Sequence, residues 1–581
     1  MKPDDPAVAE SIVAHAKTLC EREDHLWDVL ENLSIPTKLL TDTRNQSRSK
    51  FETDEIAKAF LYQHIHGLSE NELANRLKTR VTLVHSFGFD LSNKNDAPRQ
   101  QAINYIWNEG FSDSTQQIIR AAAEGIRQVA VEHDVIAEAL VSTDAPETTS
   151  NEPSDDKSTR EYKREKSTKT VDLARKHVLP EFDTKRAEHC TYSDTAIWDM
   201  FAQICANHGS AHSEGEYAWL TDDELWCDDE TFLRAIKKAA TPAEENKQLT
   251  LSDFPTSDSL PIVEAIRGEV LRPFGGATEN IINTVRGENL FDGRRNVAAI
   301  DITTEQFHVY PWEDKDAGIP KPDYPEMVSG YKKDGEIIYV YKYATITLVG
   351  DNAPIILGVE AVKEKSNWES DNAASFSKAD IVSRLLDQAE QYVDLDEVLM
   401  DRGFYSNEVY KEIDDRGLIY TTPVPKYEED YENIEKIQSH PEADEAVLHD
   451  VPFGYEGEVH HSAEFLYVPV QDDDADGNYA VFVTNRDRVE PEDISRITNR
   501  YRRRWDIENQ YLTVKSFLPK TSSKDYRVRL LRFVLTSLIY NLWRLTDYLV
   551  KIAIDMDIRS PPVITAKTFV RVLSDFLRDI G

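Results

Sequence analysis

The feature that most constrains the fold is a run of strand-like segments in the second half of the chain. Three segments rich in β-branched and aromatic residues, as strands are, lie at Asn296–Thr303, Ile338–Val349 and Pro354–Val362. The amphipathic stretch Lys378–Val393 predicts a helix, because its apolar residues recur at helical spacing. A strand, a helix and a further strand are expected at Glu397–Met400, Ser406–Asp415 and Leu418–Thr422. The resulting order β-β-β-α-β-α-β predicts a mixed α/β sheet.

Two acidic residues stand at the ends of these apolar strands. Asp301 closes one strand in AAIDIT, and Asp401 closes another in VLMDRGF. A carboxylate in such a place is costly to desolvate unless it is paired or binds a metal ion. Taken singly, each is more often a capping or salt-bridged residue. Carboxylates at strand ends in this strand order are typical of a ribonuclease-H-like sheet.

The third acidic residue of interest, Glu508, lies in the helical segment YRRRWDIENQYLTVK. At about 100° per residue, Tyr501, Arg504, Glu508 and Lys515 fall within a wedge of roughly 60°. An acid, two cations and a phenol on one helix face suit a scissile phosphate, with Glu508 on a metal ion and the cations on phosphate oxygens. The alternative is an exposed helix with incidental spacing.

The three carboxylates together favour a site for divalent cations. Carboxylate oxygens are hard ligands that suit Mg²⁺ or Mn²⁺. Two such ions, about 3.5–4 Å apart, could activate a water or a 3′-hydroxyl and stabilise the leaving oxygen of a phosphodiester. We therefore expect Asp301, Asp401 and Glu508 to hold two ions.

The net charge of −38 argues at first against a nucleic-acid partner, because phosphate binding needs a positive surface. Binding depends on local patches, however, and residues 500–533 contain ten basic and three acidic residues. The acidic excess elsewhere is dispersed along the chain. This dispersal favours a solvated surface suited to a very salty cytoplasm over an acidic segment that binds a partner.

With 581 residues the chain is too long for one compact domain. Residues 1–142 read as helical, and Gly67 is expected to end a helix there. The capping-box spacing of Ser69 and Glu72 between two apolar groups suggests a helix-turn-helix that recognises DNA. The alternative is the corner of an ordinary helical bundle. The other expected regions are a polar linker (143–170), a second helical region (171–292), the sheet domain (293–422 and 488–552), a β-rich insertion (423–487) with strands at 463–470 and 479–485, and a C-terminal helical segment (553–581).

Neither a membrane anchor nor a disulfide framework is indicated. The N-terminal segment lacks the apolar core of a signal peptide, and the best membrane candidate, Phe533–Trp543, is too short to span a bilayer. The four cysteines are scattered, without the close spacing of a disulfide framework or a zinc site. We expect a soluble, cytoplasmic protein.

The spacing Y-x2-R-x3-E-x6-K, met by Tyr501, Arg504, Glu508 and Lys515, resembles the signature of DDE insertion-sequence transposases with a β-rich insertion. AIDIT and MDRGF resemble the two aspartate motifs of that family, and the acidic composition resembles its versions in extreme halophiles. The resemblance covers about residues 295–550. It implies a ribonuclease-H-like core with Asp301, Asp401 and Glu508 as its metal triad, an insertion at 423–487, and N-terminal helices that recognise transposon ends.

The resemblance also implies contacts and partners. Arg402, beside Asp401, is a further candidate for contacting DNA, together with Tyr501, Arg504 and Lys515. The implied partners are double-stranded transposon ends and target DNA, bound by a homodimer in a synaptic complex. Some relatives stack a flipped base on a Trp of the insertion, but residues 402–504 contain no Trp. Whether a hairpin intermediate forms therefore stays open.

Three functions follow from these observations. The leading hypothesis is a cut-and-paste DNA transposase, which cleaves the transposon ends by metal-dependent hydrolysis and joins the freed 3′-hydroxyls to target DNA. The second is a nuclease or resolvase on the same core. The third is a transposase-derived DNA-binding protein without catalysis. The intact acids weigh against the third function, and the signature residues Arg504 and Lys515 weigh against the second.

Overall fold

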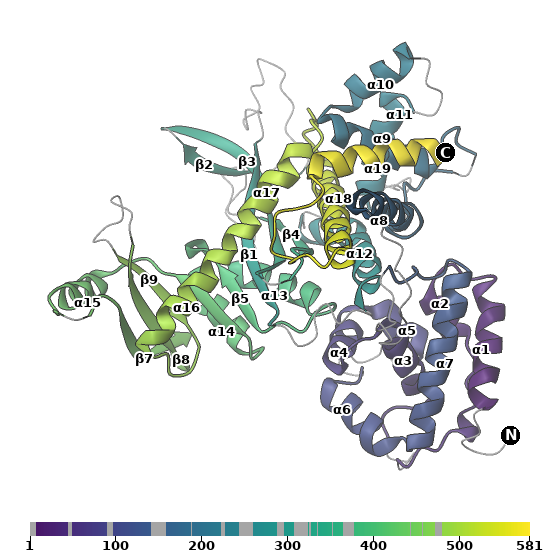
Figure 1. Ribbon diagram of the computed structural model, residues 1–581, viewed down its shortest axis with the longest axis horizontal. Helices are drawn as coiled ribbons and strands as arrows, with labels where there is room; N and C mark the ends of the chain where they lie inside the picture. Colours follow the sequence, from purple (N-terminus) through teal and green to yellow (C-terminus); the bar gives the residue numbers. More distant parts are fainter. Residues whose placement is uncertain are drawn as a thin grey trace.

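A computed structural model shows a long mixed sheet with helical regions beside it (Figure 1). The described residues are 7–44, 49–89, 97–140, 158–187, 189–221, 227–242, 259–286, 295–306, 324, 327–333, 335–350, 352–363, 377–441, 443–455, 457–470 and 479–580. The described strands are β1 (Val297–Gln306), β2 (Ser329–Lys333), β3 (Glu336–Val349), β4 (Ile356–Val362), β5 (Glu397–Met400), β6 (Ile419–Pro423), β7 (Ala446–Tyr455), β8 (Glu458–Pro469) and β9 (Tyr479–Thr484).

The strand order confirms the expected ribonuclease-H-like core. β1 pairs antiparallel with β3 and parallel with β5, and β5 pairs parallel with β6. The long strand β3 pairs antiparallel with β2 along its first part and with β4 along its second part. The core order is therefore β4-β3-β1-β5-β6, with three antiparallel strands followed by two parallel ones.

The predicted insertion continues this sheet. β9 pairs antiparallel with β6, β8 with β9, and β7 with β8, so the order extends as β6-β9-β8-β7. Helix α15 (Glu428–Gln438) lies at this end of the molecule, at the left of Figure 1. The two expected strands at 463–470 and 479–485 correspond to β8 and β9, and residues 471–478 lie outside the described part of the chain.

Two helices follow the core strands on the way to the insertion. The predicted helix at 378–393 is α13 (Lys378–Ala389), which begins at a capping box formed by Ser377 and Asp380 and packs on β4. The next, α14 (Asn407–Asp414), packs against β6 and β7. Both begin close to their predicted starts, because capping residues and apolar periodicity are local signals.

The N-terminal helices form a body with a hydrophobic core of its own. They are α1 (Ala7–Cys20), α2 (Leu26–Asn32), α3 (Thr53–His66), α4 (Glu70–Thr79), α5 (Val81–Phe87), α6 (Gln100–Tyr105) and α7 (Asp113–Glu132). As the sequence predicts, α3 ends at Gly67, whose φ of 61° is left-handed, and Ser69 and Glu72 form the capping box of α4.

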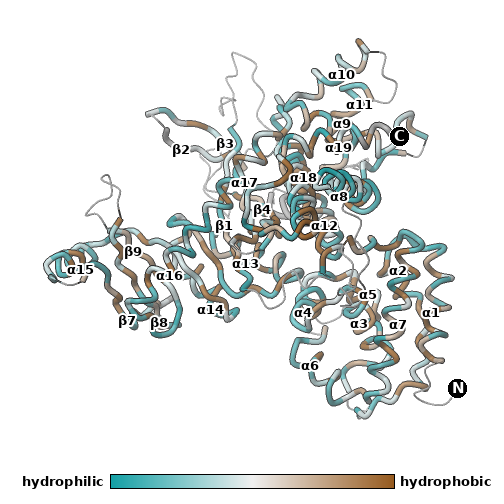
Figure 2. The backbone as a smooth tube through the Cα atoms, in the orientation of Figure 1, coloured by the Kyte–Doolittle hydropathy of each residue, from teal (hydrophilic) through white to brown (hydrophobic). Residues whose placement is uncertain are grey.

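The second helical group shares one core with the sheet. It comprises α8 (Thr159–Leu173), α9 (Asp194–Asn207), α10 (Ala211–Leu220), α11 (Asp229–Ala240) and α12 (Ser259–Asn283). Helix α8 begins inside the segment 143–170 that was predicted to be a linker; residues 141–157 lie outside the described part. Ser158 and Glu161 form its capping box, and its last turns bury Val171 and Leu173, so tertiary packing stabilises a segment of polar composition. In Figure 2, α8 is largely hydrophilic beside the more hydrophobic α12.

Helices also form the C-terminal part. α16 (Pro491–Tyr501) and α17 (Trp505–Phe517) cross the sheet obliquely in Figure 1, and α18 (Tyr526–Ala553) and α19 (Ala566–Ile580) follow them. The segment Phe533–Trp543 lies within α18 and is buried throughout. Across the described residues, no helix combines the length and the apolar character that a membrane span requires.

A buried ionic cluster joins the N-terminal body to the rest of the molecule. Arg76 of α4 and Arg80, which directly follows α4, both form ion pairs with Glu279 of α12, and the hydroxyl of Tyr62 donates a hydrogen bond of 2.8 Å to the same carboxylate. Arg76 also donates to the backbone oxygen of Gln391, just beyond α13, at 2.8 Å. The face of α4 that carries these arginines is therefore turned toward the sheet domain and not toward solvent.

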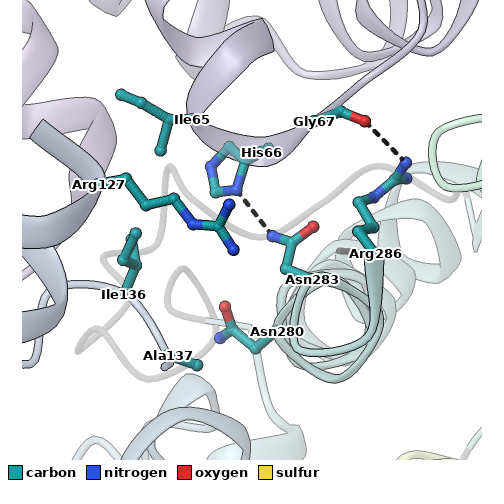
Figure 3. A pocket seen from close by; sticks show the side chains of 9 residues that line it. All are labelled: Ile65, His66, Gly67, Arg127, Ile136, Ala137, Asn280, Asn283 and Arg286. Atoms are coloured by element: carbon teal, nitrogen blue, oxygen red, sulfur yellow. Dashed lines mark hydrogen bonds between the residues drawn. The ribbon is translucent and has the colours of Figure 1, made fainter. Parts of the chain in front are cut away.

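Figure 3 shows the neighbouring part of this joint, where a small cavity lies between α3, α7 and α12. His66 Nδ1 and Asn283 Nδ2 are 2.8 Å apart, and Arg286 donates to the backbone oxygen of Gly67 at 3.4 Å. Arg286 also pairs with Glu72, so that contacts from α3 and α4 reach α12 and the residues directly after it. The N-terminal body is thus attached through polar contacts of buried side chains.

Candidate active site

The sheet register brings the first two predicted acids together. β1 and β5 are parallel, and their last paired residues are Ile300 and Met400. Asp301 and Asp401 are the next residues on each strand, so they occupy neighbouring positions where the pairing ends. Asp301 does not close its strand, contrary to the expectation, because β1 continues to Gln306 and pairs there with β3. Asp401 directly follows β5, as predicted.

Helix α17 places Glu508 over this edge. Ile507 and Val514 of α17 are buried against the sheet, and α17 contacts both β1 and β3. The buried hydroxyl of Tyr511 donates to the backbone oxygen of Asp301 at 2.8 Å and lies 2.8 Å from the hydroxyl of Thr345 on β3. Tyr511 thus fixes the position of α17 relative to Asp301. The sequence alone does not indicate this role, although Tyr511 lies three residues after Glu508, about 60° around the helix.

Arg504 links the carboxylates. One guanidinium nitrogen lies 2.6 Å from the Glu508 carboxylate, and the other terminal nitrogen lies 3.5 Å from that of Asp301. The Asp301 side chain is 15% exposed and that of Glu508 39%, so the aspartate is the more desolvated acid. Burial raises the pKa of Asp301 to about 6, while the Ile302 amide and Arg504 lower it and the charges of Asp401 and Glu508 raise it further.

Tyr501 and Lys515 lie at the margins of the same site. The guanidinium carbon of Arg504 is 5.6 Å from the centre of the Tyr501 ring, and that ring packs edge-on against Phe482 of β9 at 5.0 Å. Burial raises the pKa of Tyr501 to about 12. Burial lowers the pKa of Lys515, although the carboxylates of Glu305 and Asp301 act in the opposite direction. A strand of the insertion therefore supports one side of the site.

The path of the backbone through this region differs from the prediction of one continuous helix. Residues Arg502–Arg504 form a 3₁₀ turn between α16 and α17. A 3₁₀ turn has three residues per turn instead of 3.6, so angles computed for a regular α-helix do not hold across it. Arg504 nevertheless reaches Glu508, because the two residues remain one helical turn apart.

Arg402 lies beside Asp401 on the surface. Asp401 accepts a hydrogen bond from the amide of Gly403 and so caps the short 3₁₀ turn Arg402–Phe404. Phe404 is buried, whereas the side chain of Arg402 is exposed. The nearby Tyr405 packs against Tyr410, with 5.9 Å between ring centres, which supports a packing role for it.

Further charged residues that the sequence analysis missed lie beside Lys515. Glu305, near the end of β1, accepts hydrogen bonds from the Tyr343 hydroxyl at 2.9 Å and from Arg529 at 2.8 Å. Arg532 lies 3.4 Å from the same carboxylate. In the sequence, Arg529 and Arg532 only precede an apolar helical segment. Their contact with β1 depends on how α18 packs against the sheet.

The donor set suits a divalent cation. Three carboxylates, one of them strongly desolvated, converge on one edge of the sheet, and hard oxygen ligands of this kind bind Mg²⁺ or Mn²⁺. Within the described part of the chain, no three acidic, histidine or cysteine side chains already lie in a cluster that could chelate an ion. Instead the guanidinium of Arg504 stands between Asp301 and Glu508 and neutralises part of their charge.

Comparison with known proteins finds a similarity over part of the chain. Residues 368–542 match the family model described as a transposase DDE domain, a range that includes Asp401 and Glu508 and begins after Asp301. No curated protein matches the sequence. A cryo-EM structure of a piggyBac transposase synaptic complex with hairpin DNA aligns with 72% of this chain and 80% of that one, at 11% identity and a TM-score of 0.43. Residues 368–542 of the chain are thus similar to a transposase DDE domain.

Proposed function

We propose that the protein is a cut-and-paste DNA transposase of an insertion sequence, which cleaves at the ends of its element and transfers the freed 3′-hydroxyls into target DNA. The observation that carries this proposal is the convergence of Asp301, Asp401 and Glu508 on one edge of the sheet, with Arg504 among them. The family match over residues 368–542 supports the reaction class.

In this proposal Asp301, Asp401 and Glu508 hold Mg²⁺ or Mn²⁺, as two ions. The bound ions lower the pKa of the attacking water or hydroxyl and stabilise charge on the leaving oxygen. The protein positions these ligands through the paired strands β1 and β5 and through the hydrogen bonds of Tyr511 to Asp301 and Thr345. The rigid sheet thereby limits the carboxylates to one arrangement.

The cations around the acids bind the DNA backbone. Arg504 offers a planar fork of donors that matches two phosphate oxygens, and Lys515 adds a point charge on the same side of α17. Arg402 is exposed and can approach a phosphate beside Asp401, and the Tyr501 hydroxyl is a further donor. When DNA and metal ions bind, Arg504 exchanges its two carboxylate contacts for phosphate contacts.

Recognition of the element's ends belongs, in our proposal, to the N-terminal helices within residues 1–142. The arginine-bearing face of α4 is occupied by Glu279 and Gln391, so that face does not enter a DNA groove. The DNA-contacting surface must therefore lie on other faces of this body. The catalytic edge needs only phosphate and metal contacts, which carry no sequence information. We further propose a homodimer that holds two ends in a synaptic complex, in a cell with a salty cytoplasm.

The test is a reconstituted reaction on DNA that contains the genomic flanks of the gene. We expect the purified protein to cut at short inverted repeats and to insert the product into a plasmid, only when Mg²⁺ or Mn²⁺ is present. Sequencing of the junctions should show duplicated target sequence outside the repeats. Metal-dependent nicking at random positions without any joined product would contradict the proposal and favour a nuclease.

A further inference from the structure

Three arginines surround one buried glutamate at the start of β5. Glu397 is 1% exposed, and its Oε1 accepts a hydrogen bond from the Thr421 hydroxyl at 3.0 Å. Its Oε2 lies 2.7 Å from Arg486, 3.2 Å from Arg500 and 3.4 Å from Arg295. The first of these arginines follows β9, the second lies in the last turn of α16 and the third precedes β1. Three separate elements thus bring their guanidinium groups to one carboxylate oxygen, and we call these three residues the arginine group.

The arginine group carries more positive charge than its acidic neighbours cancel. Guanidinium groups stay protonated in proteins, so the group contributes three positive charges. Besides Glu397, the charge of Asp396 acts on Arg295. Asp493 acts on another member of the group, but it is itself paired with Arg496 at 2.6 Å. Among the described residues, Glu397 and Asp396 therefore leave a surplus of one positive charge.

The outer nitrogens of these arginines are open to solvent. The side chain of Arg295 is 33% exposed, that of Arg500 17% and that of Arg486 12%. The Nε atoms of Arg295 and Arg486 are buried, and so is Nη2 of Arg486. The other terminal nitrogens of both residues, like Nε and Nη2 of Arg500, are accessible and have no hydrogen-bond partner in the described part of the chain. A ligand at the surface can reach these donors without displacing a protein contact.

The arginine group lies apart from the acids of the candidate active site. Glu397 is the first residue of β5 and Asp401 directly follows this strand, so the two are four residues apart. At about 3.3 Å per residue, their positions are separated by about 13 Å. One chain segment reaches both places, because Arg500 contacts Glu397 and Arg504 contacts Asp301. The group therefore forms a separate site beside the candidate active site.

The surplus charge and the free donors favour a phosphodiester as the ligand. Guanidinium groups donate pairs of parallel N–H bonds that match two oxygens of a phosphate. A backbone phosphate carries one negative charge, which equals the surplus of the group. We propose that the arginine group binds a backbone phosphate of DNA away from the cleavage point. The proposal rests on the proposed function only in naming DNA as the source, because inorganic phosphate has the same chemistry.

Arginine footprinting of the full-length protein tests this site without catalysis. The protein is treated with phenylglyoxal, which modifies accessible guanidinium groups, in KCl with EDTA, and mass spectrometry measures the modification of each arginine. Arg295 and Arg500 should react in the free protein, and duplex DNA at about ten times its Kd should slow their reaction about tenfold. Arg234, exposed on α11, is the internal control and should react at an unchanged rate. A parallel series replaces part of the KCl by inorganic phosphate at equal ionic strength.

A double variant removes the surplus charge and keeps a counter-charge on the buried acid. Arg295→Gln combined with Arg500→Gln preserves the shortest ion pair of Glu397. Loss of one phosphate contact should reduce the slope of log K against log salt by about 0.9 and weaken binding to all duplexes alike. The matched control, Arg488→Gln combined with Arg502→Gln, removes two charges at exposed residues outside the group. It should change the slope by less than about 0.3.

Four outcomes decide the proposal. If neither DNA nor inorganic phosphate protects Arg295 and Arg500, the group does not bind phosphate. If inorganic phosphate protects them but DNA that is bound in a gel shift does not, the ligand is a free anion and the proposal is wrong. It is also wrong if the first double variant keeps the wild-type slope, or if both double variants lose slope equally while circular dichroism shows them folded. Protection by DNA in a protein that does not cleave would contradict the proposed function and still support this site.

Discussion

At the scale of single residues, desolvation decides the properties of the site. The side chain of Asp301 is less exposed than that of Glu508, and burial is the main cause of its raised pKa. Arg504 compensates part of this cost by pairing with Asp301 and Glu508. Carboxylates that pair with an arginine in this way can also bind a cation of higher charge.

We expect Asp301→Asn, Asp401→Asn and Glu508→Gln each to reduce the rate of cleavage of transposon ends by more than about 100-fold. Loss of a residue that only hydrogen-bonds to a metal ligand already lowers activity or metal affinity by about 10–100-fold. Each removes a proposed metal ligand but no phosphate contact, so the affinity for the ends should stay within a few-fold of wild type. Gel-shift and cleavage assays on the same preparations check both. Metal-dependent cleavage at the wild-type rate by one variant would remove that residue from the triad.

Arg504→Ala and Lys515→Ala should act on phosphate binding. Loss of one such donor costs about 10²–10³ in rate at preorganised sites, and Arg504 should show the larger loss because it also pairs with two carboxylates. Arg502→Ala, at an exposed position in the same 3₁₀ turn, is the control. Strand-transfer rates are measured at saturating DNA. Equal rates in Arg504→Ala and the control would contradict the phosphate role.

Asp199 of α9 provides a pH test of stability that is independent of the site. Burial raises its pKa to about 7, which Arg175 partly opposes, and its Oδ1 has no hydrogen-bond partner among the described residues. Its folded pKa lies above the unfolded value, so its contribution to stability is present at low pH and is lost as the pH rises toward 7. Asp199→Asn should therefore stabilise the protein more at pH 8 than at pH 5, by on the order of 2–3 kcal/mol.

Urea unfolding of the wild-type protein and of Asp199→Asn at both pH values measures this difference. An exposed acid of similar type, Asp134, serves as the control through Asp134→Asn, which should show no comparable change with pH. A stability gain for Asp199→Asn that is equal at pH 5 and pH 8 would show that Asp199 is not held protonated by burial.

At the scale of elements, the docking of α4 on α12 and on the end of α13 links the N-terminal body to the catalytic domain. Glu279 is 6% exposed and pairs with Arg76 and Arg80, which holds its pKa below the usual range. With a depressed pKa, its contribution to stability is complete above the unfolded pKa and is lost only as the pH falls through the lower folded value. The contribution of Glu279 to the joint should therefore be insensitive to pH around neutrality.

Glu279→Gln leaves two buried guanidinium groups without a counter-charge. Removal of one partner from a buried ion pair costs about 3–5 kcal/mol, so we expect a loss of that order in the free energy of unfolding at pH 7. Lys78→Ala, which removes the exposed pair between Lys78 and Asp387, should cost less than about 1 kcal/mol. Denaturant unfolding compares the two. Similar losses in both variants would show that the cluster does not stabilise the joint.

At the scale of the whole molecule, the net charge of −38 sets the response to salt. Repulsion among dispersed carboxylates destabilises the folded state when screening is weak. The Debye length falls from about 30 Å at 0.01 M salt to about 3 Å at 1 M, so molar salt removes most of this repulsion. DNA binding follows the opposite trend, because released counterions lower affinity as the salt concentration rises.

We therefore expect the protein to unfold in dilute buffer, to fold as KCl rises, and to retain end cleavage at molar KCl. Circular dichroism and end cleavage, measured from dilute buffer to several molar KCl, follow the two trends separately. A protein that is fully folded and most active in dilute buffer would show that the acidic surface has a cause other than a salty cytoplasm.

The sequence by itself determined most of the elements and the place of Asp401 directly after its strand. The strand at 397–400, the capping box of Ser69 and Glu72, and the end of α3 at Gly67 agree with the structure. These features depend on a few neighbouring residues, through side-chain periodicity, capping and backbone freedom. Asp401 was found in the same way, because an acid directly after an apolar strand is visible without knowledge of the rest of the fold.

Only the tertiary structure decided which residues of these elements contact one another. The hydrogen bond of Tyr511 to Asp301 and the contact of Arg504 with Asp301 join segments about 200 residues apart. The continuation of β1 beyond Asp301 depends on its pairing with β3, and the 3₁₀ turn at 502–504 likewise interrupts a segment whose sequence predicts one helix. The same holds for α8, whose polar sequence reads as a linker until packing buries Val171 and Leu173. The free energy of such contacts comes from desolvation and packing between distant segments. A local sequence pattern therefore does not predict these contacts.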